Sequence, residues 1–225
     1  LLISSAGPEE GKTTLAVNLA LALAQYPRRV LLIEGDLREG SLREYLGISK
    51  EKVTDWGRQL AAKSNLQDTV YEDEQLGFCV MLNDEKLPHS ANLISSQFLS
   101  HFLENAKREF DIIIIDAPQV KGRSDTEAWM RKTDISLLVV RQNKTLTKYI
   151  NDSVDVLEGY GSKLLGCVFN DVPGRIGIFT YGYGYGYGYG YGYGYGRYRR
   201  YGKYGKYGKY GKYHPYYYKK DSENK

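Results

Sequence analysis

Apolar and polar positions alternate in blocks over the first 170 residues, in a pattern typical of an α/β protein. Short apolar runs bounded by polar turns predict buried strands at residues 1–4, 30–33, 78–82, 112–115, 135–140 and 164–169. Helices are predicted at residues 14–25, 97–109 and 147–160, and the polar, mixed segment 41–74 is interpreted as helices and loops. Strands that are apolar throughout and alternate with helices predict a doubly wound, mostly parallel sheet covered on both faces.

The pattern stops after Pro173-Gly174, where the composition changes. Tyrosine and glycine alternate from Tyr181 to Gly196, and Gly-Lys-Tyr triplets continue to Tyr213. The chain has no branched aliphatic residues beyond Thr180 and cannot build a core there, so we predict a folded domain over residues 1–176 and a disordered, low-complexity tail over residues 177–225. Because the chain starts with a predicted core strand and not with methionine, we also expect an N-terminal part to be missing.

Charge is divided unevenly along the chain. The whole chain carries +4 and residues 197–225 carry +8, so residues 1–196 carry −4.

Cys79 and Cys167 form no CxxC or metal spacing, which favours a reducing compartment. No apolar run approaches the roughly 18–20 residues that span a bilayer, and no signal peptide is recognisable, so we expect a cytoplasmic location.

The segment Ala6-x4-Gly11-Lys12-Thr13 matches the looser phosphate-loop pattern, with alanine in the first glycine position. In such a loop, backbone N–H groups wrap the phosphates and the following helix points its positive end at them. Lys12 would reach the β- and γ-phosphates, and the Thr13 hydroxyl would bind Mg²⁺. A chance match in a glycine turn is the alternative, and the predicted strand and helix on either side argue against it. Glu9 and Glu10 place unfavourable negative charge near the phosphates.

Two further acids follow predicted strands. Asp116 ends the all-isoleucine strand, and Asp36 follows the second strand within Glu34-Gly35-Asp36-Leu37-Arg38. Ligands of doubly wound sheets bind at the carboxyl ends of the strands, so both acids would converge on the phosphate loop and serve Mg²⁺. Either acid alone could equally be a helix cap or a turn residue. The three motifs together, each at a strand end, favour a phosphate and magnesium site.

This order of motifs resembles the bacterial tyrosine autokinases of capsule and exopolysaccharide synthesis. Those proteins combine a Walker A loop, an A′ motif of the form apolar-Asp-x-Asp-x-Arg and a Walker B motif, and they end in a tyrosine cluster. The resemblance covers residues 1 to about 175, and the tyrosine tail extends it to about 218. Ser124-Asp125, Val139-Val140-Arg141 and the segment 166–170 also resemble the family. Glu34 replaces the first A′ aspartate, and Gln119 replaces a second proline after Walker B, but neither replacement removes a required metal ligand.

The resemblance implies a P-loop NTPase fold, an ATP and Mg²⁺ requirement, and catalytic roles for Lys12, Asp36 and Asp116. It makes Thr13, Asp36 and Asp116 the metal residues, with the two aspartates also helping to activate the attacking phenol. Asn170 could lie near the adenine, whereas Asp125 is interpreted as a helix cap. The predicted nucleotide-binding residues are Pro8, Glu9, Glu10, Gly11, Lys12, Thr13, Thr14 and Asn170.

The tail is interpreted as the substrate. A tyrosine phenol, with a pKa near 10, is a poor nucleophile, and phosphoryl transfer needs mainly positioning and charge neutralisation, which the motifs above can supply. The resemblance implies transfer to a neighbouring copy within a ring. The predicted phosphoacceptors are Tyr181, Tyr183, Tyr185, Tyr187, Tyr189, Tyr191, Tyr193, Tyr195, Tyr198, Tyr201, Tyr204, Tyr207, Tyr210, Tyr213, Tyr216, Tyr217 and Tyr218.

The family's partners would be a separate membrane activator, which would bring the protein to the inner face of the membrane, and a tyrosine phosphatase. No nucleic-acid partner is expected, although Tyr-Gly repeats with Lys and Arg also suit single-stranded nucleic acid or self-association. Two other functions stay open: a partition or positioning ATPase whose basic tail binds membrane or nucleic acid, and an interaction protein gated by a weakened nucleotide site. Partition ATPases place a second lysine five residues before the loop lysine, where this chain has Gly7.

Overall fold

The computed structural model describes residues 1–172 except 74, 123 and 161. Within these residues, seven strands form one sheet in the order β3-β4-β2-β5-β1-β6-β7, and all neighbours are parallel except β3 and β4. The strands are β1 (Leu2–Ser5), β2 (Val30–Glu34), β3 (Tyr71–Asp73), β4 (Phe78–Met81), β5 (Ile112–Asp116), β6 (Ile135–Arg141) and β7 (Lys163–Asn170). The prediction of a doubly wound, mostly parallel sheet is confirmed.

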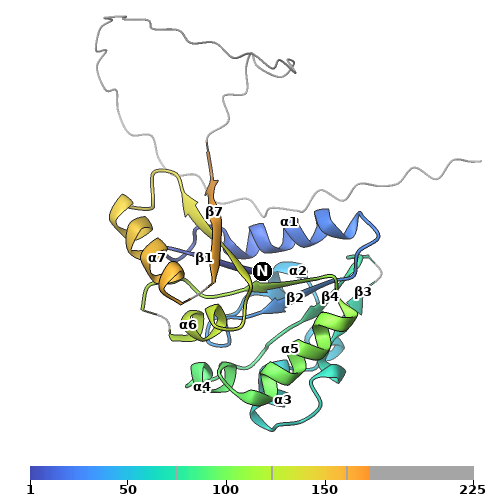
Figure 1. The fold of residues 1–225 in the computed structure, drawn as a ribbon. Coiled ribbons are helices and arrows are strands. Elements are labelled where there is room, and N and C mark those ends of the chain that lie inside the picture. The colour runs from blue at the N-terminus through green and yellow to red at the C-terminus, as the bar shows by residue number, and fades with distance from the viewer. Residues whose placement is uncertain (74, 123, 161, 173–225) are drawn as a thin grey trace, which may run out of the picture. The chain divides into compact units, whose positions relative to one another are not determined.

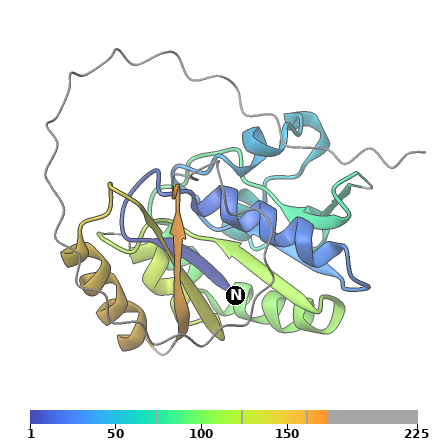
Figure 2. The same cartoon turned by 90° about the horizontal axis from the view of Figure 1, so that it is seen from above.

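Helices cover both faces of the sheet (Figures 1 and 2). The α-helices are α1 (Lys12–Ala24), α2 (Leu42–Leu46), α3 (Trp56–Ala61), α4 (Ser90–Ile94), α5 (Gln97–Glu109), α6 (Ser124–Met130) and α7 (Thr147–Gly159). Two short 3₁₀ turns span Lys50–Lys52 and Gln67–Thr69. No helix in the described ranges combines the length and apolarity needed to cross a bilayer.

Strand β2 shows why apolar runs predict this sheet. Val30 and Leu32 pack with α1, whereas Leu31 and Ile33 pack on the opposite face with α5 and α6. Every residue of the strand is buried, because successive side chains point to opposite faces and both faces carry helices.

The structure corrects the predicted elements at several places. A short strand, β3, lies within the segment 41–74 that we interpreted as helices and loops, and it pairs antiparallel with β4 at one edge of the sheet. Helices α4 and α6 were not predicted, because five and seven residues are too few to show a helical period. The predicted tail lies outside the described residues, so the domain boundary stays a prediction.

Candidate active site

The phosphate loop connects β1 to the first residue of α1, Lys12. Two of its residues adopt left-handed backbone conformations, Glu9 with φ 55° and Gly11 with φ 97°. Glycine is required at position 11 for this φ, and also because the Asn170 amide lies where a β-carbon would project. The loop therefore turns sharply into the helix N-terminus, the geometry that binds phosphate groups.

An open cavity of about 430 Å³ lies between this loop, the segment after β2 and the segment after β5. Six of the eight predicted nucleotide-binding residues line it, together with the predicted metal residue Asp36. The lining residues are Pro8, Glu9, Gly11, Lys12, Thr13, Thr14, Asp36, Glu39, Ser41, Pro118 and Gln119.

Asp116 lies behind the cavity at the end of β5. The Thr13 hydroxyl donates to Asp116 Oδ2 over 2.6 Å, so the two residues predicted to serve the metal are in direct contact. Burial raises the pKa of Asp116 to about 6, against the opposing effects of the Thr13 hydrogen bond and the Lys12 charge. Asp116 Oδ1 is buried and has no hydrogen-bond partner among the described residues. A hydroxyl and an unsatisfied carboxylate oxygen are ligands that fit Mg²⁺.

Asp36 belongs to the A′ segment, residues 34–38, which follows β2 and packs closely on the end of β5. The Gly35 N–H donates to Asp116 O over 2.9 Å. A β-carbon at position 35 would lie 2.7 Å from Ile115 Cγ2, so glycine permits this approach. Asp36 Oδ1 accepts the backbone N–H groups of Arg38 (3.1 Å) and Glu39 (2.9 Å), which fixes the carboxylate at the cavity wall.

Two buried tryptophans hold the backbone of the same segment. Trp56 Nε1 donates to Glu34 O over 3.0 Å, and Trp129 Nε1 donates to Gly35 O over 2.9 Å. Their ring centroids are 6.0 Å apart. The indole donors come from α3 and α6, so two helices on one face of the sheet support the end of β2.

Glu34, the residue that departs from the A′ pattern, is turned away from the cavity. Its carboxylate accepts the Leu42 N–H at Oε1 (2.7 Å) and the Asn83 N–H at Oε2 (2.8 Å). Burial raises the pKa of Glu34 to about 7, against the two backbone hydrogen bonds. Glu34 therefore connects the start of α2 to the segment after β4, and it does not line the cavity.

Glu10 and Asn170 are the two predicted nucleotide-binding residues that do not line the cavity. The buried Glu10 carboxylate accepts the Gly7 N–H (3.1 Å) and the Thr145 hydroxyl (2.6 Å). Asn170 Nδ2 donates to Glu10 O over 2.9 Å. The Glu10 carboxylate therefore points into the protein and not toward the predicted phosphate position, where its charge would be unfavourable. Glu10 and Asn170 both support the phosphate loop from the side opposite the cavity.

Sequence reasoning missed that the end of β6 and the segment between β6 and α7 hold the phosphate loop. Arg141 Nη1 donates to Glu9 O (3.2 Å), and Lys144 Nζ donates to Glu9 Oε2 (3.0 Å). The ion pair with Lys144 lowers the pKa of the exposed Glu9 carboxyl. The Val-Val-Arg resemblance marked Arg141, but no sequence signal paired this segment with the phosphate loop.

Asp125 was interpreted as a helix cap, and the structure gives it a different role. Within the first turn of α6, its carboxylate accepts hydrogen bonds from Arg38 and Ser90, so its described partners belong to other segments. The predicted phosphoacceptor tyrosines all lie outside the described residues.

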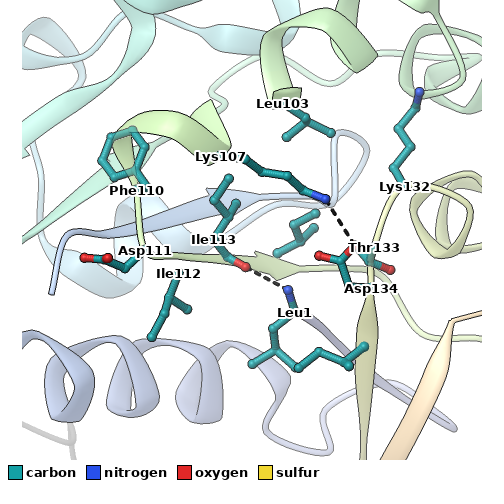
Figure 3. A pocket seen from close by; sticks show the side chains of 12 residues that line it. Leu1, Leu103, Lys107, Phe110, Asp111, Ile112, Ile113, Lys132, Thr133 and Asp134 are labelled. Atoms are coloured by element: carbon teal, nitrogen blue, oxygen red, sulfur yellow. Dashed lines mark hydrogen bonds and ion pairs between the residues drawn. The ribbon is translucent and has the colours of Figure 1, made fainter. Parts of the chain in front are cut away.

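A second cavity, of about 390 Å³, opens at the opposite ends of the strands, where β1 and β5 begin (Figure 3). The amino group of Leu1 donates to Ile113 O there (2.8 Å), and Lys107 pairs with Asp134 (3.1 Å). It contains none of the predicted site residues. The candidate site is therefore the cavity at the carboxyl ends of the strands, as expected for this fold class.

The fold and site define a P-loop nucleotide-binding α/β protein with A′ and Walker B acids. Comparison with known proteins agrees: the model of an AAA domain family matches residues 8–149. The tyrosine-protein kinase YwqD of Bacillus subtilis is 30% identical over 170 residues, which cover 76% of this chain and 71% of YwqD. The tyrosine-protein kinase ptk of Acinetobacter johnsonii is 33% identical over 173 residues, 76% of this chain.

A solved structure of the kinase domain of the Escherichia coli tyrosine kinase ETK superposes with a TM-score of 0.72 at 30% identity. The match covers 82% of this chain and 71% of the ETK domain. The chain belongs to the bacterial tyrosine-kinase family. It spans most of YwqD but only 23% of the Acinetobacter kinase, so it corresponds to a part of that longer relative.

Proposed function

We propose that this chain is an ATP- and Mg²⁺-dependent protein-tyrosine kinase that phosphorylates tyrosines 181–218 of another copy. The contact between Thr13 and Asp116 beside the phosphate loop carries the proposal, because it joins a P-loop hydroxyl to a buried carboxylate with one unsatisfied oxygen. Asp36 lies in the wall of the same cavity. Membership of the tyrosine-kinase family and the tyrosine-rich tail supply the reaction class.

The site residues have different proposed roles in phosphoryl transfer. Backbone N–H groups of the loop and the Lys12 ammonium would hold the β- and γ-phosphates and neutralise their charge. Thr13, Asp116 and Asp36 would hold Mg²⁺, which supplies further charge neutralisation when bound. The tyrosine oxygen attacks the γ-phosphorus, the bond from that phosphorus to the ADP oxygen breaks, and Asp36 accepts the phenol proton.

The cellular setting is proposed from the family. A separate membrane activator would bring the kinase to the inner face of the membrane, a ring of copies would present tails to neighbouring sites, and a tyrosine phosphatase would reverse the reaction. The cycle would regulate capsule or exopolysaccharide synthesis and export.

The contact of Glu10 with Gly7 argues against the partition-type ATPase. A β-carbon at position 7 would lie 3.2 Å from Glu10 Oε1, so a lysine there would crowd the buried carboxylate. This chain therefore has glycine where partition ATPases place the second lysine, and the Glu10 carboxylate lies against that position.

Incubation of the full chain with Mg-ATP and an activator segment, followed by phosphotyrosine mapping by mass spectrometry, tests the proposal. Phosphate is expected on tail tyrosines and should disappear in Lys12→Met. Lys148→Met, the same substitution at an exposed site on α7, is the matched control and should retain it. ATP hydrolysis without phosphotyrosine would replace the kinase with an ATPase switch. Salt-sensitive binding to anionic vesicles or RNA would then support the partition-type function.

A further inference from the structure

Arg38 and Asp125 form a bidentate ion pair beside the candidate site. Arg38 Nε donates to Asp125 Oδ2 over 2.9 Å, and Arg38 Nη2 donates to Asp125 Oδ1 over 3.0 Å. The Ser90 hydroxyl donates to Asp125 Oδ2 over 2.6 Å and accepts from Arg38 Nε over 3.0 Å. These bonds connect the A′ segment after β2 to α4 and α6.

The burial of the pair is asymmetric. The Asp125 side chain is completely buried, whereas 35% of the Arg38 side chain is exposed. A buried carboxylate is stable only when it is paired, so Asp125 requires the Arg38 guanidinium in this position. A planar guanidinium that binds both carboxylate oxygens is held in position and orientation, which a single hydrogen bond would not achieve.

The Arg38 backbone in turn helps to hold the Asp36 carboxylate in place. Its backbone N–H is one of the two that Asp36 Oδ1 accepts, the other being that of Glu39. Asp36 lines the 430 Å³ cavity, whereas Arg38 is not among the lining residues. The Arg38 side chain therefore points toward α6 while its backbone supports the acid at the cavity wall.

We propose that Asp125 is a positioning residue for Asp36, acting through Arg38. The completely buried carboxylate fixes the guanidinium, and the guanidinium fixes the backbone N–H that orients the Asp36 carboxylate toward the metal position. This inference rests on the proposed function, in which Asp36 serves Mg²⁺. In this proposal, α6 and α4 hold the A′ segment in its metal-binding conformation before Mg²⁺ binds.

Nucleotide affinity, measured with and without Mg²⁺, separates positioning from general packing. A fluorescent ADP analogue would be titrated into the full chain in EDTA and again in Mg²⁺. In Asp125→Asn, we expect the gain in affinity that Mg²⁺ brings to fall by about tenfold, because groups that orient metal-binding side chains typically contribute on this scale. Affinity in EDTA should stay within about twofold, since Lys12 and the loop backbone are untouched.

The matched control is Asp152→Asn, the same change at an exposed position of α7, which should leave both affinities unchanged. Arg38→Lys keeps the charge but loses the bidentate geometry, so it should reproduce the Asp125→Asn effect. The double variant should lose little more than either single one, because both act through one interaction. Ser90→Ala, which removes one donor to Asp125, should give a smaller loss of the same kind if Asp125→Asn fails to fold.

Equal losses in EDTA and in Mg²⁺ would show that the pair only stabilises the fold and would overturn the proposal. An unchanged Mg²⁺ gain in Asp125→Asn, Arg38→Lys or, if needed, Ser90→Ala would overturn it as well. A wild-type chain without any Mg²⁺ gain would overturn the proposed function itself, and with it this role. The wild-type titration therefore distinguishes the two failures.

Discussion

Three acids at the ends of β2 and β5 share a functional group but differ in their surroundings. Asp116 is buried against Thr13, Asp36 lies at the cavity wall, and Glu34 is buried between two backbone N–H groups. The extra methylene of Glu34 helps its carboxylate reach both Leu42 and Asn83. Which of these acids can bind a metal therefore depends on the direction of its side chain and not on residue type alone.

Glu34 should make the metal-free protein less stable as pH rises. Its pKa is raised on folding from 4.5 to about 7, so its contribution to the free energy of unfolding is fully present below pH 4.5 and is lost as pH rises to about 7. Denaturant unfolding of the wild type and Glu34→Gln, in EDTA at several pH values, isolates this contribution. The wild-type free energy minus that of the variant should fall by up to about 3 kcal/mol over this range.

Glutamine stays neutral throughout, so carboxylates elsewhere cancel in this difference. A difference that did not vary between pH 4.5 and 7 would show that Glu34 titrates normally and that its burial is not maintained in solution.

At the scale of elements, the site depends on how closely β2 and β5 approach at their ends. We expect Gly35→Ala to lower the free energy of unfolding by about 1–3 kcal/mol, because the new methyl would meet Ile115, Asp116 O and Trp129 Nε1 at 2.7–3.0 Å. Gly159→Ala, at the end of α7 with no atom within 4 Å, is the control and should lose nothing. Equal stability of the two variants in urea unfolding would contradict this close packing.

The segment between β6 and α7 should act as a support for the phosphate loop. Thr145→Val removes the hydroxyl that donates to the buried Glu10 carboxylate, so nucleotide affinity should fall by about five- to tenfold. Thr147→Val makes the same change at an exposed position two residues away and should have no effect. Titration of both variants with fluorescent ADP measures the difference; matching affinities would mean that the loop holds its shape without Thr145.

Strands and long helices could be predicted from the sequence, because burial on both faces leaves continuous apolar runs such as residues 112–115. The short elements β3, α4 and α6 could not, since each has fewer residues than the window over which a helical or strand period can be recognised. Lys12, Thr13, Asp36 and Asp116 could be placed from the ends of predicted strands. The inward turn of Glu10 and the pairing of Asp125 with Arg38 could not, because both depend on contacts between residues more than 80 positions apart.

For the whole molecule, the uneven charge predicts how modification would act. Residues 1–196 carry −4 and residues 197–225 carry +8. Each phosphate adds about −1.5 to −2 charges, so about four or five phosphotyrosines would cancel the charge of the basic segment. We expect heavy phosphorylation to loosen an assembly of acidic domains and basic tails. Light scattering should show smaller particles after incubation with ATP, and Lys12→Met protein treated identically should not change; particles of equal size would refute the idea.

Both tryptophans of the chain, Trp56 and Trp129, donate to consecutive carbonyls of the segment that carries Asp36. Indole emission is sensitive to its immediate surroundings, and red-edge excitation avoids the many tyrosines. The protein therefore carries an optical probe at the position where we expect metal and nucleotide to act. Movements of the A′ segment can be followed in the unlabelled chain in real time, and the spectrum contains no other tryptophan to obscure them.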